Sequence, residues 1–192
     1  DPRDSKYLDI AVQEISDLLA ITEGGAFILC TSLRVMGALG KRFQHRSEYT
    51  VFVQGQAPKN ALLERFRSAP AAVLFATTSF WEGVDVPGNA LRLVVIDKLP
   101  FDVPTDPLVV ARCTRLEEEG VSAFGKYLLP SATLALKQGF GRLIRTEEDR
   151  GVVAVLDSRL VTRGYGKVFL RSLPAARRCG SVAEVRAFWG GA

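Results

Sequence analysis

The side chains of Gln138, Arg142 and Arg145 stand at positions i, i+4 and i+7 of one segment. If this segment is helical, all three project from one face, one turn apart. Arginine is always charged, and its rigid fork of N–H donors matches the oxygens of a phosphate. The spacing therefore predicts that this segment binds a polyphosphate or a nucleic-acid backbone. The alternative is a solvated basic helix face, which Gly139 and Gly141 disfavour because they let a ligand approach closely.

A second segment, residues 77–88, carries hydroxyls, glycines and carboxylates directly after an apolar run at 71–76. The run is typical of a buried strand, and open α/β sheets bind ligands at the carboxyl ends of their strands. Hydroxyl and backbone N–H groups there can bind phosphate, and a carboxylate such as Asp85 can orient a ribose or an arginine. The alternative is a turn-rich connection in which Asp85 caps local backbone.

The two segments resemble motifs VI and V of superfamily-two helicases, and the likeness is to the DinG/XPD-like branch of DNA helicases. Residues 27–33, with Thr31-Ser32 after an apolar run, are similar to motif IV. Residues 98–107 are similar to the stretch that follows motif V in bacterial DinG-like proteins. The resemblance spans about residues 20 to 175. It implies the second motor domain of an ATP-dependent DNA helicase that acts in DNA repair or replication in the bacterial cytoplasm.

The resemblance also implies roles on the nucleotide side. ATP and Mg²⁺ would bind in a cleft between this domain and an N-terminal motor domain of the same protein. Arg145 and Arg142 would reach the γ-phosphate as arginine fingers, and Gln138 would sense the phosphate or the attacking water. The residues implied to border the nucleotide and couple it to DNA are Glu82, Gly83, Asp85 and Gly141.

On the DNA side, the resemblance implies that Thr31, Ser32 and Thr77 contact the phosphates of single-stranded DNA. Hydroxyl groups position a strand in this way without reading its bases. All three follow apolar runs that we expect to pair in one parallel sheet, so their hydroxyls should lie along one edge. The implied partners are single-stranded DNA and the N-terminal motor domain, with no membrane.

The chain lacks the elements that bind ATP phosphates and a metal ion directly. The nearest string to a P-loop has Val35 in place of the first glycine and Arg42 in place of the hydroxyl residue. The three cysteines are far apart and form no CxxC pair, so the chain by itself predicts no zinc or iron–sulfur site. The resemblance implies that the P-loop, the magnesium-binding acid and any iron–sulfur domain lie in an N-terminal half absent from this chain.

Apolar runs alternate with helical patterns along the chain. Continuous apolar strands between helices predict a parallel sheet covered on both faces, which is a RecA-like α/β fold. We expect one such domain over residues 1–192, a fragment of a longer protein. The expected strands are 26–31, 50–54, 72–76, 91–96 and 151–157, and the expected helices are 7–20, 32–43, 59–67, 107–119 and one that begins near Pro130 and carries the arginine segment. Ser32 is the expected N-cap of the second helix. The single histidine, His45, is expected to be a surface residue at the end of that helix.

Charge is unevenly distributed over the 192 residues. The segment 137–178 holds 10 Lys and Arg against 4 Asp and Glu, while residues 1–136 hold 14 against 16. A basic region favours a polyanionic partner through counterion release. The scattered cysteines suit a reducing cytoplasm, and no apolar run approaches the roughly 20 residues that span a bilayer.

Two other classes of function were weighed. A RecA-like module could bind nucleic acid or protein without turnover, and an upstream P-loop in the full-length gene would decide against it. A small-molecule enzyme on a Rossmann-like sheet is disfavoured, because Gly24-Gly25 precede the first strand and no Gly-x-Gly-x-x-Gly follows it.

Because the chain has no P-loop, we expect the isolated chain to show no ATPase activity and only weak ATP affinity. The measurement is phosphate release with Mg²⁺ and ATP, with and without single-stranded DNA. Magnesium-dependent turnover that DNA stimulates would contradict a catalytic site shared between two domains.

Overall fold

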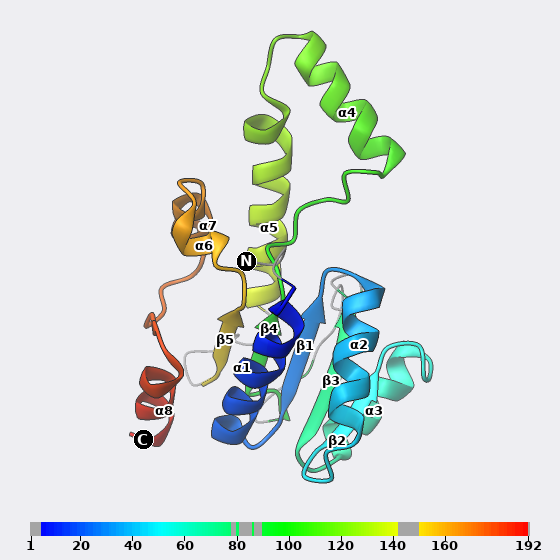
Figure 1. The fold of residues 1–192 in the computed structure, drawn as a ribbon, viewed down its shortest axis with the longest axis vertical. Coiled ribbons are helices and arrows are strands. Elements are labelled where there is room, and N and C mark those ends of the chain that lie inside the picture. The colour runs from blue at the N-terminus through cyan, green and yellow to red at the C-terminus, as the bar shows by residue number, and fades with distance from the viewer. Residues whose placement is uncertain (1–4, 78–79, 81–85, 87–89, 142–149, 192) are drawn as a thin grey trace.

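A sheet of five parallel strands organises the fold in a computed structural model of the chain (Figure 1). The structure describes residues 5–77, 80, 86, 90–141 and 150–191. The strands are ordered β2-β3-β1-β4-β5 across the sheet. Their bounds are Ala26–Cys30 (β1), Thr50–Val53 (β2), Ala72–Thr77 (β3), Leu93–Ile96 (β4) and Val152–Val155 (β5). All five predicted strands are confirmed, with ends that differ by up to two residues.

The central strands are apolar at every position except Thr77, the last residue of β3, because helices cover both faces of the sheet. Every residue of β1, β3 and β4 is buried, as expected for strands in the middle of a parallel sheet. Successive side chains alternate between two cores. Phe27 and Leu29 belong to one of them, and Ile28 and Cys30 to the other.

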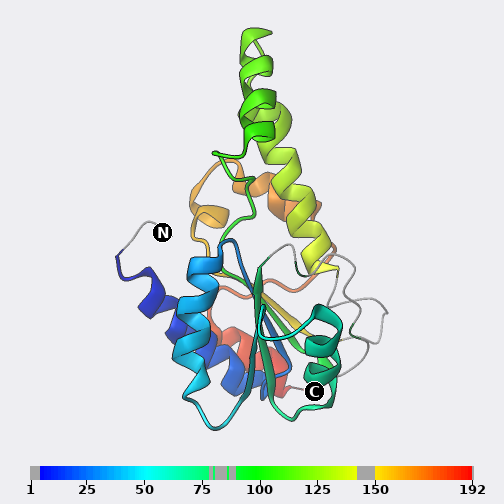
Figure 2. The same cartoon turned by 90° about the vertical axis from the view of Figure 1, so that its right-hand side faces the viewer.

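Helices α1 (Tyr7–Thr22) and α2 (Leu33–Gln44) cover one face, with α8 (Val182–Gly190) beside α1 (Figures 1 and 2). The other face packs against α3 (Lys59–Ser68), part of α5 (Leu129–Phe140) and α7 (Gly166–Ser172). The predicted helices at 7–20, 32–43 and 59–67 are thus confirmed. The helices that close the chain, α6 (Arg159–Thr162), α7 and α8, were not predicted. They are short, and glycines and a proline that end helices stand between them.

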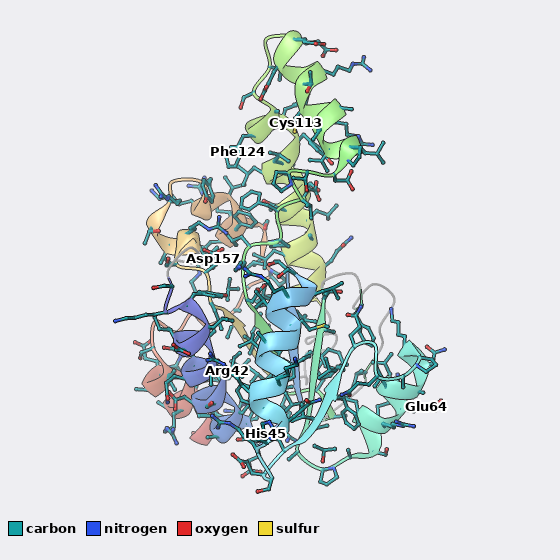
Figure 3. All side chains as sticks on the ribbon, turned by 45° about the vertical axis from the view of Figure 1, so that its right-hand side comes forward. Arg42, His45, Glu64, Cys113, Phe124 and Asp157 are labelled. Carbon is teal, nitrogen blue, oxygen red and sulfur yellow. The ribbon has the colours of Figure 1, made fainter. Side chains whose placement is uncertain are left out.

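A helical arm projects from the carboxyl edge of the sheet. It consists of α4 (Pro107–Glu118), a π-helical turn (Phe124–Leu128) and the first turns of α5, and both views show it extending well beyond the sheet (Figures 1 and 2). Figure 3 shows Cys113 and Phe124 on this arm, far from His45 at the opposite end of the molecule. The predicted helix at 107–119 is confirmed, and Pro130 lies in the first turn of α5. The arm is anchored at its base, where Ala132 and Leu136 of α5 enter the core.

None of the helices among the described residues combines the length and the apolar character needed to cross a bilayer.

Candidate nucleic-acid interface

A polar side chain follows each strand at the carboxyl edge of the sheet. The pairing Cys30↔Thr77 aligns β1 with β3, and Leu29↔Ile96 aligns β1 with β4. The strand ends therefore meet along one line, as we predicted for the hydroxyl residues. In the order of the sheet, the polar residues at or just after the strand ends are Gln54, Thr77, Thr31, Asp97 and Asp157.

Thr77 is held by its neighbour from β2. Its backbone N–H and its hydroxyl donate to the Oε1 atom of Gln54, at 2.7 and 3.0 Å. The residue is only 9% exposed. A contact between the Thr77 hydroxyl and a DNA phosphate would therefore require this internal hydrogen bond to be exchanged.

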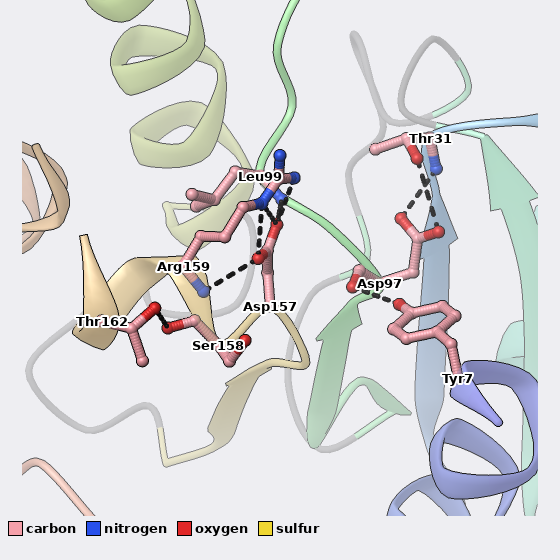
Figure 4. A network of polar contacts seen from close by, with 8 residues as sticks. All are labelled: Tyr7, Thr31, Asp97, Leu99, Asp157, Ser158, Arg159 and Thr162. Atoms are coloured by element: carbon pink, nitrogen blue, oxygen red, sulfur yellow. Dashed lines mark hydrogen bonds and ion pairs between the residues drawn. The ribbon is translucent and has the colours of Figure 1, made fainter. Parts of the chain in front are cut away.

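Thr31 is held by a buried carboxylate from β4 (Figure 4). Its backbone N–H donates to Oδ1 of Asp97 at 2.8 Å, and its hydroxyl donates to Oδ2 at 3.4 Å. The Tyr7 hydroxyl of α1 donates to the main-chain carbonyl of Asp97. Asp97 thus joins α1, the end of β4 and the turn between β1 and α2, although it is 0% exposed.

Burial has a measurable electrostatic consequence at Asp97. Desolvation raises the pKa of this carboxyl to about 6, against the lowering effects of hydrogen bonds from Thr31 and of the charge and backbone N–H of Lys98. Burial also raises the pKa of Tyr7 and of Cys30 beside it. The ionised form of Asp97 is therefore costly in the folded protein, and it is the group of this cluster that titrates near neutral pH.

Ser32 begins α2 and differs from the two threonines. It is the N-cap residue, and its hydroxyl oxygen accepts a hydrogen bond from the backbone N–H of Val35 at 3.3 Å. Among the described residues the Ser32 hydroxyl donates to none, so its proton can face an external acceptor. The prediction that Ser32 caps this helix is confirmed.

The first turn of α2 has the properties of an anion site. Leu33 and Arg34 are exposed there, and no acidic residue lies in the first turn. The first N–H groups of a helix have no intrahelical acceptor, and the helix dipole makes this end positive. Arg34 adds a cation where the dipole disfavours one, so the turn is suited to a bound phosphate.

Asp157 forms a second buried network, at the end of β5 (Figure 4). Its carboxylate accepts from the backbone N–H of Leu99 at 2.9 Å and pairs with the Arg159 guanidinium at 2.6 Å. Although burial opposes it, the hydrogen bonds from Arg159 and Leu99 hold the pKa of Asp157 below its ordinary value. This network fixes the chain that leaves β4 for the arm, and it does not touch the turn between β1 and α2.

The residues predicted for the nucleotide side are only partly described. Gln138 is exposed near the end of α5, and Gly141 is the C-cap. Helix α5 is described as far as Phe140, and the expectation that the helix carries Arg142 and Arg145 stays a prediction, because residues 142–149 lie outside the described part of the chain. Two glycines in three residues, at 139 and 141, weaken the last turn.

Several predicted site residues lie outside the described part of the chain. They are Arg142, Arg145, Glu82, Gly83 and Asp85. Besides Thr77, the structure describes two residues of the same motif, and both are in the core: Phe80 is 6% exposed and Val86 is 4% exposed. At Gly141 an added Cβ would meet only ordinary contacts, from carbonyl oxygens at 3.6 and 3.7 Å. Packing within the described residues therefore does not require glycine there.

The sequence patterns did not predict three polar residues of this edge: Gln54, Asp97 and Asp157. A signal was present, because each is the first polar residue after an apolar strand. In the part of the chain that the structure describes, no group of three or more His, Cys, Asp or Glu side chains could hold a metal ion. The single histidine, His45, is an exposed residue at the end of α2, as we expected.

The fold and the edge just described define a RecA-like α/β domain whose carboxyl edge carries the N-terminus of α2. A family model described as "Helicase C-terminal domain" matches residues 15–176. The chain therefore belongs to the helicase C-terminal domain family, as its motifs predict.

Curated relatives and solved structures agree with this assignment. The chain is 47% identical over 171 residues to "ATP-dependent DNA helicase YoaA" of Escherichia coli, covering 89% of this chain and 27% of that protein. It is 41% identical over 174 residues to "ATP-dependent helicase DinG" of Mycobacterium tuberculosis, covering 91% and 26%. The chain thus spans about a quarter of the length of these relatives. A solved apo XPD structure matches with a TM-score of 0.64 and 18% identity, over 90% of this chain and 35% of that one, which shows the shared fold.

Replacing Asp97 with Asn tests the cost of its charge. The folded-state pKa of about 6 lies above the ordinary 3.8, so this group destabilises the fold increasingly as pH rises from about 4 through 6. Asparagine keeps an acceptor for the Thr31 N–H and carries no charge. The unfolding free energy of Asp97→Asn relative to the native chain should therefore grow by about 1 kcal/mol between about pH 5 and pH 8. Denaturant titrations at the two pH values measure it, and a difference that stays constant or shrinks would contradict the buried charge.

Proposed function

We propose that this chain is the second motor domain of an ATP-dependent DNA helicase of the DinG/XPD type, acting in bacterial DNA repair or replication. The observation that carries the proposal is the first turn of α2. In a domain of the helicase C-terminal family, this turn presents a hydroxyl proton with no acceptor among the described residues, the first N–H groups of a helix and Arg34, at the carboxyl edge of the sheet. The relatives named as DNA helicases are bacterial, so we place the protein in the cytoplasm.

Single-stranded DNA is the proposed ligand of this edge. Ser32 would donate to a phosphate oxygen, and the N–H groups of Leu33 and Arg34 would complete the contact. Thr31 and Thr77 would border the same backbone, with their hydroxyls turned toward Asp97 and Gln54. Contacts of this kind bind any base sequence and weaken with salt.

ATP is the second proposed ligand. It would bind in a cleft between this domain and an N-terminal motor domain of the same protein. The donors predicted here, Gln138, Arg142 and Arg145, suit phosphate oxygens. The described residues offer no group of acidic side chains for a metal ion, so Mg²⁺ and any iron–sulfur cluster would be held by the rest of the protein. Bound Mg²⁺ would neutralise charge on the β- and γ-phosphates.

The arginines supply the chemistry that this chain contributes. As phosphoryl transfer proceeds, negative charge develops on the γ-phosphate oxygens, and Arg145, assisted by Arg142, would stabilise it. Gln138 would orient the phosphate or the attacking water. Glu82, Gly83, Asp85 and Gly141 would border the nucleotide. The motif that contains Glu82 and Asp85 starts at the end of β3, next to β1 and its DNA-contacting turn. It could therefore couple the nucleotide state to the grip on DNA.

Ser32→Ala in the full-length enzyme should weaken binding of single-stranded DNA by about 0.5–1.5 kcal/mol, the net value of one hydrogen bond. The loss should be equal for different base sequences, since a phosphate carries no sequence information. Fluorescence anisotropy titrations at fixed salt measure it.

Ser181→Ala is the matched control for the lost helix cap. Ser181 caps α8 through a hydrogen bond from Glu184 N–H at 3.3 Å, the same distance as at Ser32. Both variants should lose similar stability, but only Ser32→Ala should lose DNA affinity. Equal affinities for the two variants, or a loss confined to one base sequence, would refute the phosphate contact.

Arg145→Ala in the full-length enzyme should lower the rate of ATP hydrolysis by about 10³-fold or more, the scale of other arginine fingers. Binding of single-stranded DNA without nucleotide should stay within a few-fold, because the arginine acts on the γ-phosphate. Steady-state turnover and DNA titrations separate the two effects. Arg163→Ala removes the same charge from an exposed position in a loop and should leave turnover unchanged. Intact turnover with weakened DNA binding would show instead that Arg145 faces DNA.

A further inference from the structure

The turn that begins α2 is oriented by a carboxylate that neither the sequence motifs nor the proposed mechanism uses. Asp97 directly follows β4, sixty-six residues along the chain from Thr31, and both of its carboxylate oxygens accept hydrogen bonds from that residue (Figure 4). Its side chain is fully buried, so it cannot contact DNA itself. Any effect on DNA must therefore pass through Thr31 and the turn.

The protonation state of Asp97 decides which way the Thr31 hydroxyl proton points. An ionised carboxylate only accepts hydrogen bonds, so the Thr31 hydroxyl must donate inward to Oδ2. Its proton is then unavailable to a phosphate, and Ser32 and the first N–H groups of α2 remain as the donors that face outward. A protonated carboxyl can instead donate to Thr31 Oγ1, which frees the Thr31 proton to point outward.

The groups around Asp97 leave it as the one that switches near neutral pH. Tyr7 of α1 and Cys30 of β1 face it, and burial raises the pKa of both, so they stay protonated. Lys98 supplies a neighbouring cation. Asp157, with Arg159, acts on the same cluster through Tyr7, and its pKa is lowered, so it stays ionised.

The negative charge of Asp97 is not needed to stabilise the turn between β1 and α2. An asparagine at this position could accept the Thr31 N–H equally well without the desolvation cost of a buried ion. A buried charge that costs stability is typical of residues that serve a site.

We propose that Asp97 is a positioning residue for DNA binding: its carboxylate turns the Thr31 hydroxyl inward and leaves Ser32 and the first N–H groups of α2 to hold the phosphate. The inference rests on the proposed function, because it assumes that this turn contacts single-stranded DNA. In chemical terms, Asp97 limits the number of donors offered to the phosphate and makes that number depend on pH.

The test is a pH series of single-stranded DNA titrations on the full-length enzyme and its Asp97→Asn variant. The asparagine Nδ2 donates to Thr31 Oγ1 and so mimics the protonated carboxyl. At about pH 8 the variant should bind single-stranded DNA about three- to tenfold more tightly, the value of one added hydrogen bond. The advantage should shrink toward nothing near pH 5.5, as Asp97 in the native enzyme takes up its proton.

Thr31→Val separates hydroxyl orientation from loss of charge. In the native background it should cost less affinity at about pH 8, where the hydroxyl donates inward to Asp97, than near pH 5.5, where the Thr31 proton can point outward. In the Asp97→Asn background it should abolish the gain. A gain that persists without the hydroxyl, a gain independent of pH, or no gain at all in a folded Asp97→Asn enzyme would overturn the inference. If Asp97→Asn fails to fold, a native-background Thr31→Val enzyme that loses the same affinity at pH 8 and at pH 5.5 would overturn it instead.

Asp157→Asn is the matched control for removing a buried carboxylate at the same edge. The Asp157 carboxylate is hydrogen-bonded to Leu99 and Arg159 and not to the turn between β1 and α2. The DNA affinity of the Asp157→Asn enzyme should therefore not change. An equal gain from Asp157→Asn would show a general charge effect and overturn the inference. Ser32→Ala in the same series distinguishes the two proposals. If it has no effect, the DNA contact itself fails, whereas a loss at Ser32 with no effect at Asp97 refutes only the positioning role.

Discussion

The parallel pairing of β1 with β3 on one side and β4 on the other is the interaction on which the rest of this structure depends. Parallel strands need crossover connections, and here helices supply several of them and cover both faces of the sheet. The same pairing brings every strand's carboxyl end to one edge. A ligand site assembled from several loops is a direct consequence.

The edge is polar, and its polar groups are mostly satisfied within the protein. Gln54 accepts hydrogen bonds from Thr77, and Asp97 accepts them from Thr31. Asp157 accepts one from the Leu99 N–H group. Such internal bonds fix loop geometry near a ligand, which a binding site needs more than additional donors. Ser32, at the start of α2, is the exception, because its hydroxyl donates to none of the residues that the structure describes.

A guanidinium partner decides in which direction the pKa of each buried carboxyl at this edge is shifted. Asp97 and Asp157 are both buried, yet their pKa values move in opposite directions because only Asp157 has a guanidinium partner. Asp157, which is paired with Arg159, supports the fold. Asp97 depends instead on hydrogen bonds from the N–H and O–H groups of Thr31, which lies in the turn before α2. Two carboxylates on one edge can therefore serve different purposes.

The sequence by itself determined the five strands, most of the larger helices, the RecA-like fold class and the family, because apolar periodicity and motif spacing are local properties of the chain. It also identified Ser32 as a helix cap. It missed Asp97, whose importance comes from a partner sixty-six residues away. Only the tertiary structure decided which hydroxyls are already engaged, since hydrogen-bond partners across a sheet depend on strand order and register, which no local pattern encodes.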